Sequence, residues 1–590
     1  MHEVVEELKK RINIVEFIGS YITLKKAGRN FKAICPFHNE KNPSFVVSPD
    51  RQIWHCFGSC HEGGDVIKFM MKWENSTFYE VVKELTHKYG VKLPTGAIDD
   101  KAANERERLF SLNAIASEYF TYVLTNTTFG EKALEYLHGR GMSDSIIKTF
   151  SLGYAPSSWD SLTKFLKKKK FTEREIIAAG LVVTRERGGF YDRFRGRLMF
   201  PLKDLKGLVV GFSGRVLEGE GSGAKYINTP ETILYHKRET LFGINLAKEG
   251  IKKENNVYIV EGEFDMINPF EHGVTNVVAI KGSALTMDQL MLLRRYTNTV
   301  TLALDTDEAG IDAMIKGIEL AEDLEFELKI ATFDYAKDPD EAVRTDAVRF
   351  KKALFQAVPV YDFLFSIYEK RYPTTDPFAK KKFADNLVPV LDRIRNPIIR
   401  THYFRLLAQK LDIEMNSLEL IARRLKEKKT RFSRPKAIYS AETKEGDRSK
   451  LIEKHLISLL LQDTPGYKLS EELFEIIKPD DFSLASHQKL LLAYLDFQTD
   501  QTKRFDINVF IQYLPAELQA VADELYLFAS GETDAADLSA SHLGREIKRY
   551  ALKRRVAAFG MADELTEADK KALSEALLEL NRVEKNIISV

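Results

Sequence analysis

Acidic side chains with the spacing of metal ligands stand out in this 590-residue chain. Glu261, Asp305, Asp307, Asp338 and Asp340 each come after a short apolar run. A single aspartate before a helix is most often a cap. Several carboxylates brought to one place would repel one another unless a cation neutralised them, and oxygen ligands suit Mg²⁺ or Mn²⁺. The pattern therefore predicts a divalent-metal site.

The elements that must position these acids alternate between strand and helix. Apolar strands are predicted at 257–260, 276–280, 299–304 and 327–333, and segments such as 286–296 between them have helical periodicity. This alternation is typical of a parallel sheet with helices on both faces. Functional groups of such sheets gather at the carboxyl ends of the strands, which is where the acids occur.

A second set of side chains has the spacing of zinc ligands. The chain has three cysteines, Cys35, Cys56 and Cys60, and a predicted strand-turn-strand separates the pair Cys35 and His38 from Cys56 and Cys60. An odd number of clustered cysteines argues against disulfides and for a metal. Three thiolates and one imidazole predict a single structural zinc ion that folds this small module. His55 and His61 remain alternatives to Cys60 as the fourth ligand.

Composition limits the remaining classes of function. With 87 basic and 86 acidic residues the net charge is +1, so nucleic-acid binding must use local basic surface. We expect no membrane association and a cytoplasmic location, because neither a signal-peptide profile nor an apolar run of membrane-spanning length is present. The chain contains no Gly-Lys dipeptide, which excludes a Walker A loop and a fused helicase motor.

Two stretches of the chain resemble known families. The acidic motifs, with Glu261-Gly262 first and Asp338-Pro339-Asp340 last, are similar to the Toprim domain of bacterial primases, topoisomerases and some nucleases. The stretch 35–65, CPFHNEKNPSF followed by WHCFGSCHEGGD, resembles the zinc-binding domain of the bacterial replicative primase of the DnaG type. That family usually has Cys-Phe-Gly-Cys at the second pair of ligands, whereas this chain has Ser59 at the last cysteine position and Cys60 one residue later.

Basic residues between these two regions complete the resemblance. The stretch RFRGRLMFP alternates arginine with apolar residues, which predicts a strand with a cationic face formed by Arg193, Arg195 and Arg197. GFSGR and KYINTPET follow and resemble the basic subdomain of the primase family. By position, the resemblance implies that template or nucleotide is held by Arg140, Arg215, Lys225 and Tyr226. The stretch 282–286 is similar to the family's G-T-A-L-T, with Lys281 as an unusual neighbour.

The expected fold is multidomain, α/β followed by all-α. It comprises a zinc ribbon, a mixed α/β basic subdomain, a Rossmann-like Toprim sheet and carboxyl-terminal helical bundles. The expected parts are the zinc ribbon (1–95), a linker (96–109), the basic subdomain (110–255), the Toprim domain (256–345), a helical subdomain (346–428), a linker (429–450) and a helicase-interaction domain (451–590).

The resemblance implies a primase, a DNA-dependent RNA polymerase that makes short RNA primers de novo on single-stranded DNA from ribonucleoside triphosphates. Two Mg²⁺ or Mn²⁺ ions would act in nucleotidyl transfer, with Glu261, Asp305 and Asp307 as primary ligands and Asp265, Asp338 and Asp340 in support. The replicative helicase would bind the last module, and the chain would be monomeric in isolation and act at replication forks. The main alternative is a DNA-cleaving Toprim enzyme, a topoisomerase or nuclease, although no tyrosine is marked as a nucleophile. A binding protein with a decayed site and a phosphatase using Asp305 are less favoured.

Overall fold

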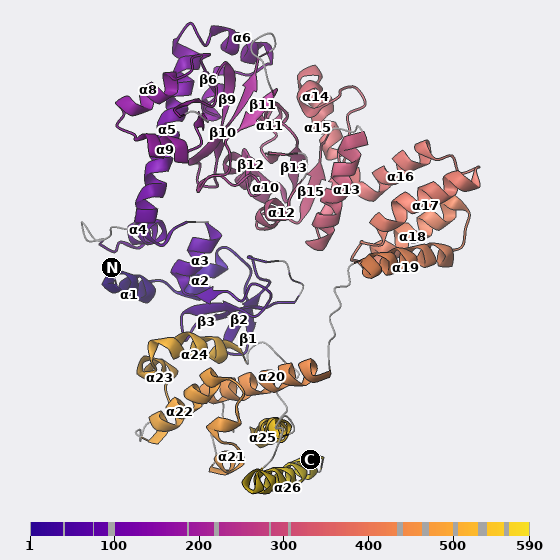
Figure 1. The fold of residues 1–590 in the computed structure, drawn as a ribbon. Helices are drawn as coiled ribbons and strands as arrows, with labels where there is room; N and C mark the ends of the chain where they lie inside the picture. Colours follow the sequence, from indigo (N-terminus) through magenta and orange to yellow (C-terminus); the bar gives the residue numbers. More distant parts are fainter. Residues whose placement is uncertain are drawn as a thin grey trace. The chain divides into compact units, whose positions relative to one another are not determined.

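The computed structural model describes most of the chain in two compact units. One unit comprises Met1–Ala97 with Arg434–Val590, and the other is Ile98–Ser433. The helices and strands are labelled in Figure 1. The described residues are 2–38, 40, 42–74, 76–92, 101–185, 188–217, 224–282, 285–304, 308–432, 441–462, 471–499, 505–528, 540–559 and 566–588.

The amino-terminal module is a small antiparallel sheet, of strand order β1-β2-β3-β4-β5, with four helices. The expected strand-turn-strand is confirmed, because β3 and β4 pair with Val47 opposite Trp54. The apolar periodicity of residues 5–18 forms two helices instead of one, because the Asn13 side chain accepts from the backbone N–H groups of Val15 and Glu16 and so begins a new helix. The elements are α1 His2–Arg11, α2 Ile14–Gly19, β1 Lys25–Ala27, β2 Asn30–Ala33, β3 Phe45–Ser48, β4 Ile53–Cys56, β5 Gly63–Gly64, α3 Val66–Trp73 and α4 Phe78–Tyr89.

The next part of the chain is a mixed α/β subdomain whose antiparallel sheet has the strand order β11-β10-β9-β6. Its first helix, α5, packs against β6 and β10 and begins at Lys101, inside the segment that the sequence predicts as a linker. The elements are α5 Lys101–Asn126, α6 Glu131–Gly139, α7 Asp144–Thr149, β6 Gly153–Ala155, α8 Ser161–Lys168, α9 Glu173–Ala178, β7 Val182–Thr184, β8 Phe190–Asp192, β9 Arg197–Lys203, β10 Val209–Val216 and β11 Tyr226–Asn228.

The predicted parallel sheet is confirmed. Strands β14, β13, β15 and β16 are neighbours in this order and run parallel, with the short strands β12 and β17 antiparallel at the edges. Along β14, Val277 and Ala279 enter one apolar cluster while Val278 and Ile280 enter another, so both faces of the sheet are buried. The elements are β12 Leu241–Phe242, α10 Ile244–Glu254, β13 Val257–Val260, α11 Glu263–Glu271, β14 Val277–Ile280, α12 Met287–Arg294, β15 Thr299–Leu302, α13 Glu308–Asp323, β16 Glu327–Ile330, α14 Pro339–Thr345, α15 Ala347–Phe355 and β17 Val358–Pro359.

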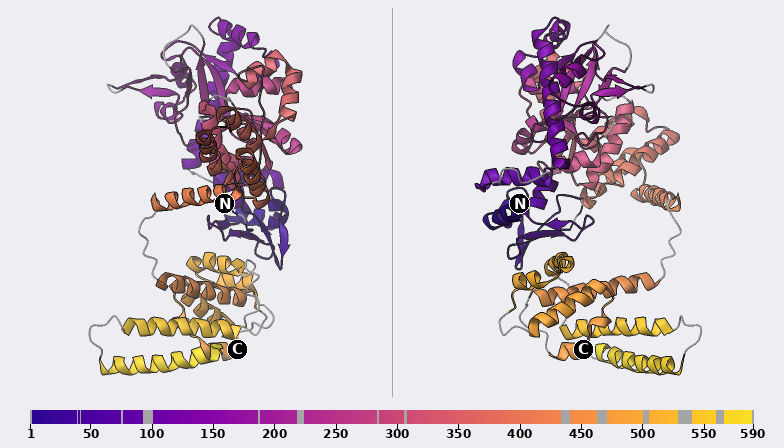
Figure 2. Two further views of the ribbon diagram at one scale, coloured as in Figure 1. Left: turned by 90° about the vertical axis from the view of Figure 1, so that its right-hand side faces the viewer. Right: turned by 60° about the vertical axis from the view of Figure 1, so that its left-hand side comes forward.

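The remaining described elements are helical, as expected. Four helices follow the sheet: α16 Val360–Arg371, α17 Pro377–Leu391, α18 Pro397–Leu411 and α19 Met415–Phe432. The last helices are α20 Ala441–Leu461, α21 Glu471–Ile476, the 3₁₀ turn η1 Pro479–Asp481, α22 Ala485–Thr499, α23 Ile507–Tyr513, α24 Ala516–Phe528, α25 Ala540–Phe559 and α26 Glu567–Ile588. Figure 2 shows α25 and α26 side by side. Both ends of the expected linker 429–450 are helical, in α19 and α20. None of the helices in the described part of the chain is long and apolar enough to cross a membrane.

Candidate zinc site and acidic pocket

The four expected zinc ligands come together in the amino-terminal module. Cys35 and His38 follow β2, Cys56 ends β4, and Cys60 precedes β5. One ligand atom of each lies within 4.8 Å of the others. The Sγ atoms of Cys35 and Cys60 are 3.8 Å apart, and Cys56 Sγ is 3.6 Å from His38 Nδ1. These spacings match the edges of a tetrahedron whose sulfur and nitrogen corners lie about 2.3 and about 2.0 Å from one zinc ion, so the donor set fits zinc.

A carboxylate and a glycine support His38. Glu40 Oε2 lies 3.1 Å from His38 Nε2, on the side of the ring away from the thiols, and Glu40 Oε1 accepts from the backbone N–H groups of Cys35 and Ser44. A carboxylate in this position orients a ligating imidazole and raises its basicity. A Cβ added to Gly58 would lie 2.4 Å from His38 Nε2, so only glycine leaves room for this arrangement.

The other candidates of this module have different surroundings. His55 and His61 do not belong to the cluster of ligand atoms found among the described residues. Cationic and aromatic side chains of this module, among them Lys41 and Trp54, also suit recognition of a single-stranded template by phosphate pairing and base stacking. Trp54, however, is 1 % exposed and stacks on Phe45 in the core. Lys41 lies outside the described residues.

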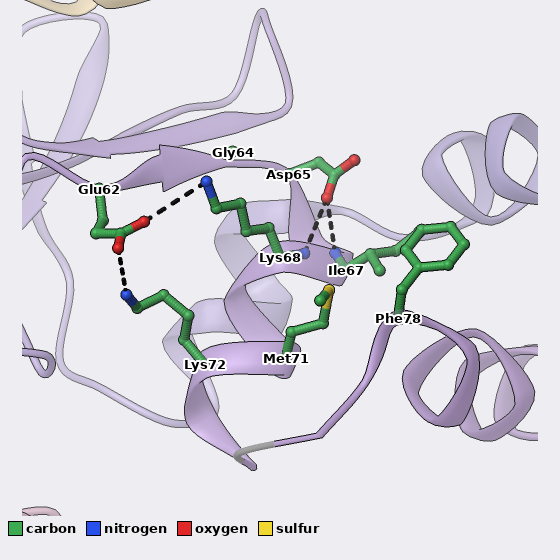
Figure 3. A pocket seen from close by; sticks show the side chains of 8 residues that line it. All are labelled: Glu62, Gly64, Asp65, Ile67, Lys68, Met71, Lys72 and Phe78. Atoms are coloured by element: carbon green, nitrogen blue, oxygen red, sulfur yellow. Dashed lines mark hydrogen bonds and ion pairs between the residues drawn. The ribbon is translucent and has the colours of Figure 1, made fainter. Parts of the chain in front are cut away.

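A pocket of about 560 Å³ lies beside helix α3 of the same module (Figure 3). Glu62 binds Lys72 at 2.6 Å and Lys68 at 3.5 Å, and Asp65 caps the helix by accepting from the N–H groups of Ile67 and Lys68. Because the carboxylates of Glu62 and Asp65 together balance the charges of Lys68 and Lys72, this pocket offers little positive charge to a phosphate.

A second pocket, of about 500 Å³, lies at the carboxyl ends of the parallel strands. It brings together Glu261, Asp265, Asp338 and Asp340 with the four residues expected to hold template or nucleotide. Of these, Arg215 and Tyr226 lie on the antiparallel sheet, Lys225 just precedes β11, and Arg140 follows helix α6. Asp305 and Asp307 lie outside the described residues. The pocket is lined by Arg140, Ser213, Arg215, Lys225, Tyr226, Asn228, Lys237, Glu261, Gly262, Glu263, Phe264, Asp265, Ile280, Lys281, Gly282, Lys337, Asp338 and Asp340.

Local structure explains how the acids reach the pocket. Glu261 follows the last residue of β13 and is exposed. Asp265 lies in the first turn of α11, where its Oδ2 accepts from the N–H of Gly262, and its Oδ1 accepts from the N–H of Asp340. Asp338 is the N-cap of α14, accepting from the Glu341 N–H at 2.8 Å. Carboxylate oxygens are the ligands that divalent cations prefer, and these acids line one pocket, although among the described residues only Cys35, His38, Cys56 and Cys60 form a close group of possible metal ligands.

Asp340 differs from the other acids because its oxygens already have donors. Arg140 Nη1 donates to its Oδ2 at 2.6 Å, and Arg344 donates to both oxygens at 3.2 and 3.1 Å. Asn268 also donates to it. The side chain is 5 % exposed. Asp340 therefore anchors Arg140, a cationic residue of the pocket.

Two arginines of the pocket stack on one aromatic ring. The guanidinium carbons of Arg140 and Arg215 lie 4.6 and 4.7 Å from the centroid of Phe264, which is 3 % exposed. Arg215 also lies 3.3 Å from the Tyr226 hydroxyl, and burial raises the pKa of that phenol. Such cation–π contacts fix the planes of the guanidinium groups before any anionic ligand arrives.

The three arginines of the RFRGR stretch do not line this pocket, and the predicted strand is confirmed only from Arg197 onward. Arg193 and Arg195 lie in the connection between β8 and β9, and Arg197 is the first residue of β9. Arg193 donates to the Gly180 carbonyl, and Arg195 stacks on Trp159 and Tyr191. Arg197 is 6 % exposed and donates to backbone carbonyls, including those of Gly214 and Ala224. Alternation alone could not distinguish a strand from a loop whose arginines satisfy carbonyl groups.

The pocket also contains residues that the sequence analysis did not select. Asn228 follows Tyr226 by two residues on β11 and could have been found from the KYINTPET stretch. Nothing around Lys237 in the sequence marks it, and only the fold brings it to Gly282, where an added Cβ would lie 3.4 Å from its Cε.

A glutamate and a lysine form a buried ion pair in the same pocket. Glu263 and Lys281 have side chains that are 3 % and 5 % exposed. Burial by itself would raise the pKa of Glu263, but the charge of Lys281 and its hydrogen bond lower this pKa below its ordinary value. The glutamate is therefore a buried carboxylate held by a cation.

Sequence models of four families match successive parts of the chain. They are described as CHC2 zinc finger (residues 1–101), DNA primase catalytic core, N-terminal domain (119–248), Toprim-like (258–343) and DnaB-helicase binding domain of primase (361–415). The chain thus has a zinc finger and a Toprim-like region, a class that binds divalent metal. The helicase-binding model matches helices α16 to α18, whereas the sequence analysis placed that role in residues 451–590.

Full-length relatives match most of the chain. A DNA primase of Enterococcus faecalis is 32% identical over 581 residues, which cover 89% of this chain and 91% of the relative. A DNA primase of Clostridium acetobutylicum is 34% identical over 512 residues, 84% of this chain and 82% of the relative. The crystal structure of the zinc-binding and RNA polymerase domains of the Aquifex aeolicus primase is 31% identical, covers 70% of this chain and 98% of that chain, and has a TM-score of 0.47. Because the two sequence relatives are each more than 30% identical over more than four fifths of their length, the chain belongs to the bacterial DNA primases of the DnaG type.

Proposed function

We propose that this chain synthesises short RNA primers de novo on single-stranded DNA from ribonucleoside triphosphates. The observation that carries this proposal is the acidic pocket at the carboxyl edge of the sheet. Four carboxylates and a set of cationic residues line one space of about 500 Å³, with the acids on the sheet domain and Arg215, Lys225 and Tyr226 on the basic subdomain. A nucleotidyltransferase needs this combination, because it must hold divalent cations and polyanionic substrates together.

Acidic and basic residues of the pocket have different proposed roles, the acids in binding metal ions and the basic residues in binding phosphates. Glu261, Asp305 and Asp307 are the proposed primary ligands of two Mg²⁺ or Mn²⁺ ions, with Asp265 and Asp338 in support. The cations would lower the pKa of the attacking hydroxyl and would neutralise the charge of the departing pyrophosphate. Arg140 and Arg215, held by Phe264, would orient phosphates by bidentate contacts. Lys225, Lys237 and Asn228 would position the template or the nucleotide.

The zinc site would serve structure and not catalysis. Cys35, His38, Cys56 and Cys60 hold the turns of a module too small to rely on its core alone. The alternative, a DNA-cleaving Toprim enzyme, is not favoured, since the relatives that match most of the chain are DNA primases. We further propose that the chain is monomeric and acts in the cytoplasm at replication forks, and that the sequence-derived division into seven parts describes its domains.

Primer synthesis without a primer tests the proposal. Purified chain is incubated with single-stranded DNA, labelled ribonucleotides and Mg²⁺ or Mn²⁺, beside Asp305→Ala and Glu261→Gln. We expect short RNA from the unaltered chain and a loss of at least about a hundredfold in both variants, with DNA affinity nearly unchanged because cationic residues supply it.

The exposed Glu254→Gln is a matched control that should keep full activity. Cleavage of the single-stranded DNA without RNA synthesis would instead assign the pocket to DNA cleavage.

A further inference from the structure

The buried pair of Lys281 and Glu263 lies at the junction of three elements. Lys281 follows the last residue of β14, and Glu263 is the first residue of α11. Lys281 Nζ also lies 5.6 Å from the ring centroid of Phe242, beside the edge strand β12. Ser213 of β10, a fully buried residue of the basic subdomain, lines the same pocket.

Glu263 lies among the proposed metal ligands, so its charge affects how they bind cations. It lies two residues after Glu261 and two residues before Asp265, and all three line the acidic pocket. The proposed metal ligands on α11 and the preceding loop are therefore separated by a further carboxylate. Unless a cation held it, Glu263 would repel its neighbours or compete with them for the divalent ions.

We propose that Lys281 is a positioning residue for the metal site, which keeps Glu263 from acting as an additional metal ligand and holds the first turn of α11 against the end of β14. The inference rests on the proposed function, because it assumes that the acidic pocket binds divalent cations. A buried ion pair by itself is weak evidence for stabilisation, since well-packed apolar side chains often do as well. Because the pair lies between proposed metal ligands, it has a role that a pair of apolar side chains could not fill.

Two other roles for Lys281 lead to different observations. A lysine that bound the triphosphate of the incoming nucleotide would need its ammonium group accessible, but the side chain is 5 % exposed and its Nζ is bound to Glu263. If Lys281 served only packing, removing its charge alone and removing it together with the charge of Glu263 would have the same effect on metal binding.

The test measures metal binding directly. Mn²⁺ is titrated into the zinc-loaded full chain, without DNA or nucleotide, and free Mn²⁺ is followed by electron paramagnetic resonance. The compared forms are the unaltered chain, Lys281→Met, the double variant Lys281→Met/Glu263→Gln, and Lys253→Met as a control. The Lys253 side chain is 83 % exposed on α10 of the same domain.

We expect Lys281→Met to bind Mn²⁺ about tenfold more tightly, because it removes a cation and releases a carboxylate, while kcat for RNA synthesis falls and the KM for nucleotide is unchanged. The double variant should return Mn²⁺ affinity to within about threefold of the unaltered chain, because neither charge remains. Lys253→Met should match the unaltered chain in both assays.

The outcomes separate the two proposals. If the unaltered chain bound no Mn²⁺, the proposed metal site itself would fail. If it bound Mn²⁺ and the double variant behaved like Lys281→Met, or Lys281→Met left Mn²⁺ affinity unchanged, the positioning role would be overturned. An increase in the KM for nucleotide alone would assign Lys281 to the triphosphate instead.

Discussion

Opposite charges alternate along the wall of the acidic pocket. Asp340 accepts from Arg140 and Arg344, and Glu263 is held by Lys281. Glu261 is exposed beside them. Carboxylates bound in this way keep the cationic side chains oriented when no substrate is present. The same principle applies at the zinc site, where Glu40 lies behind His38.

We expect Glu40→Gln to weaken zinc binding by about tenfold to about a hundredfold, because it removes the negative charge that supports the His38 imidazole. The amide oxygen of glutamine can still accept from the N–H groups of Cys35 and Ser44, so the turn itself should persist. Zinc release to a chromophoric chelator measures the affinity. Glu3→Gln, an exposed carboxylate on α1, is the matched control. Equal zinc release from both variants would show that Glu40 supports only the turn.

At the scale of elements, close approaches decide how the parallel sheet is assembled. Helix α10 packs against β14, and its Gly250 lies close to Thr275, which precedes that strand. A Cβ added there would lie 2.8 Å from backbone atoms of Thr275. Since backbone cannot rotate away as a flexible side chain can, glycine at this position sets the spacing between helix and sheet.

Two opposing effects make Gly250→Ala informative. Alanine favours a helix interior by about 1 kcal/mol over glycine, but the clash with Thr275 costs about 1–3 kcal/mol, so we expect a net loss of stability. The midpoint of thermal unfolding should fall. Gly139→Ala is the matched control, because Gly139 ends α6 with nothing within 4 Å of an added Cβ, and its midpoint should stay or rise. A higher midpoint for Gly250→Ala would mean that α10 shifts without cost.

At the scale of the whole molecule, two segments are candidates for the helicase contact. The family match at residues 361–415 points to helices α16 to α18. The most exposed large apolar side chains there are those of Phe378, which is 76% exposed, and Ile398, which is 79% exposed. The helices from 451 onward, which the sequence marks as a separate module without chemical motifs, are the second candidate.

We expect both segments to contribute to helicase binding. The variants are Phe378→Ser/Ile398→Ser and a chain truncated after Phe432, and binding of each to the replicative helicase is measured by calorimetry. Each should bind more weakly than the full chain, since each removes part of the contact. Val348→Ser, at an 80% exposed apolar side chain outside the matched segment, is the control. An effect of only one change would assign the contact to that segment alone.

The sequence by itself determined the elements whose signals are local. Apolar runs with turn residues between them predicted β13 to β16 and their parallel direction, and ligand spacing predicted the group of Cys35, His38, Cys56 and Cys60. Local patterning suffices there because periodicity and short loops limit the arrangements that bury both faces of a strand or close a tetrahedral site.

Only the tertiary structure decided which distant side chains share a site. Lys237, Asn228 and the pair of Lys281 and Glu263 enter the acidic pocket because the antiparallel and parallel sheets pack together, a relation that no local spacing encodes. The same packing leaves Arg193 and Arg197 donating to backbone carbonyls, away from the pocket. Charge in a sequence shows that a side chain needs a partner, and the fold determines whether that partner is a carbonyl, a carboxylate or a substrate.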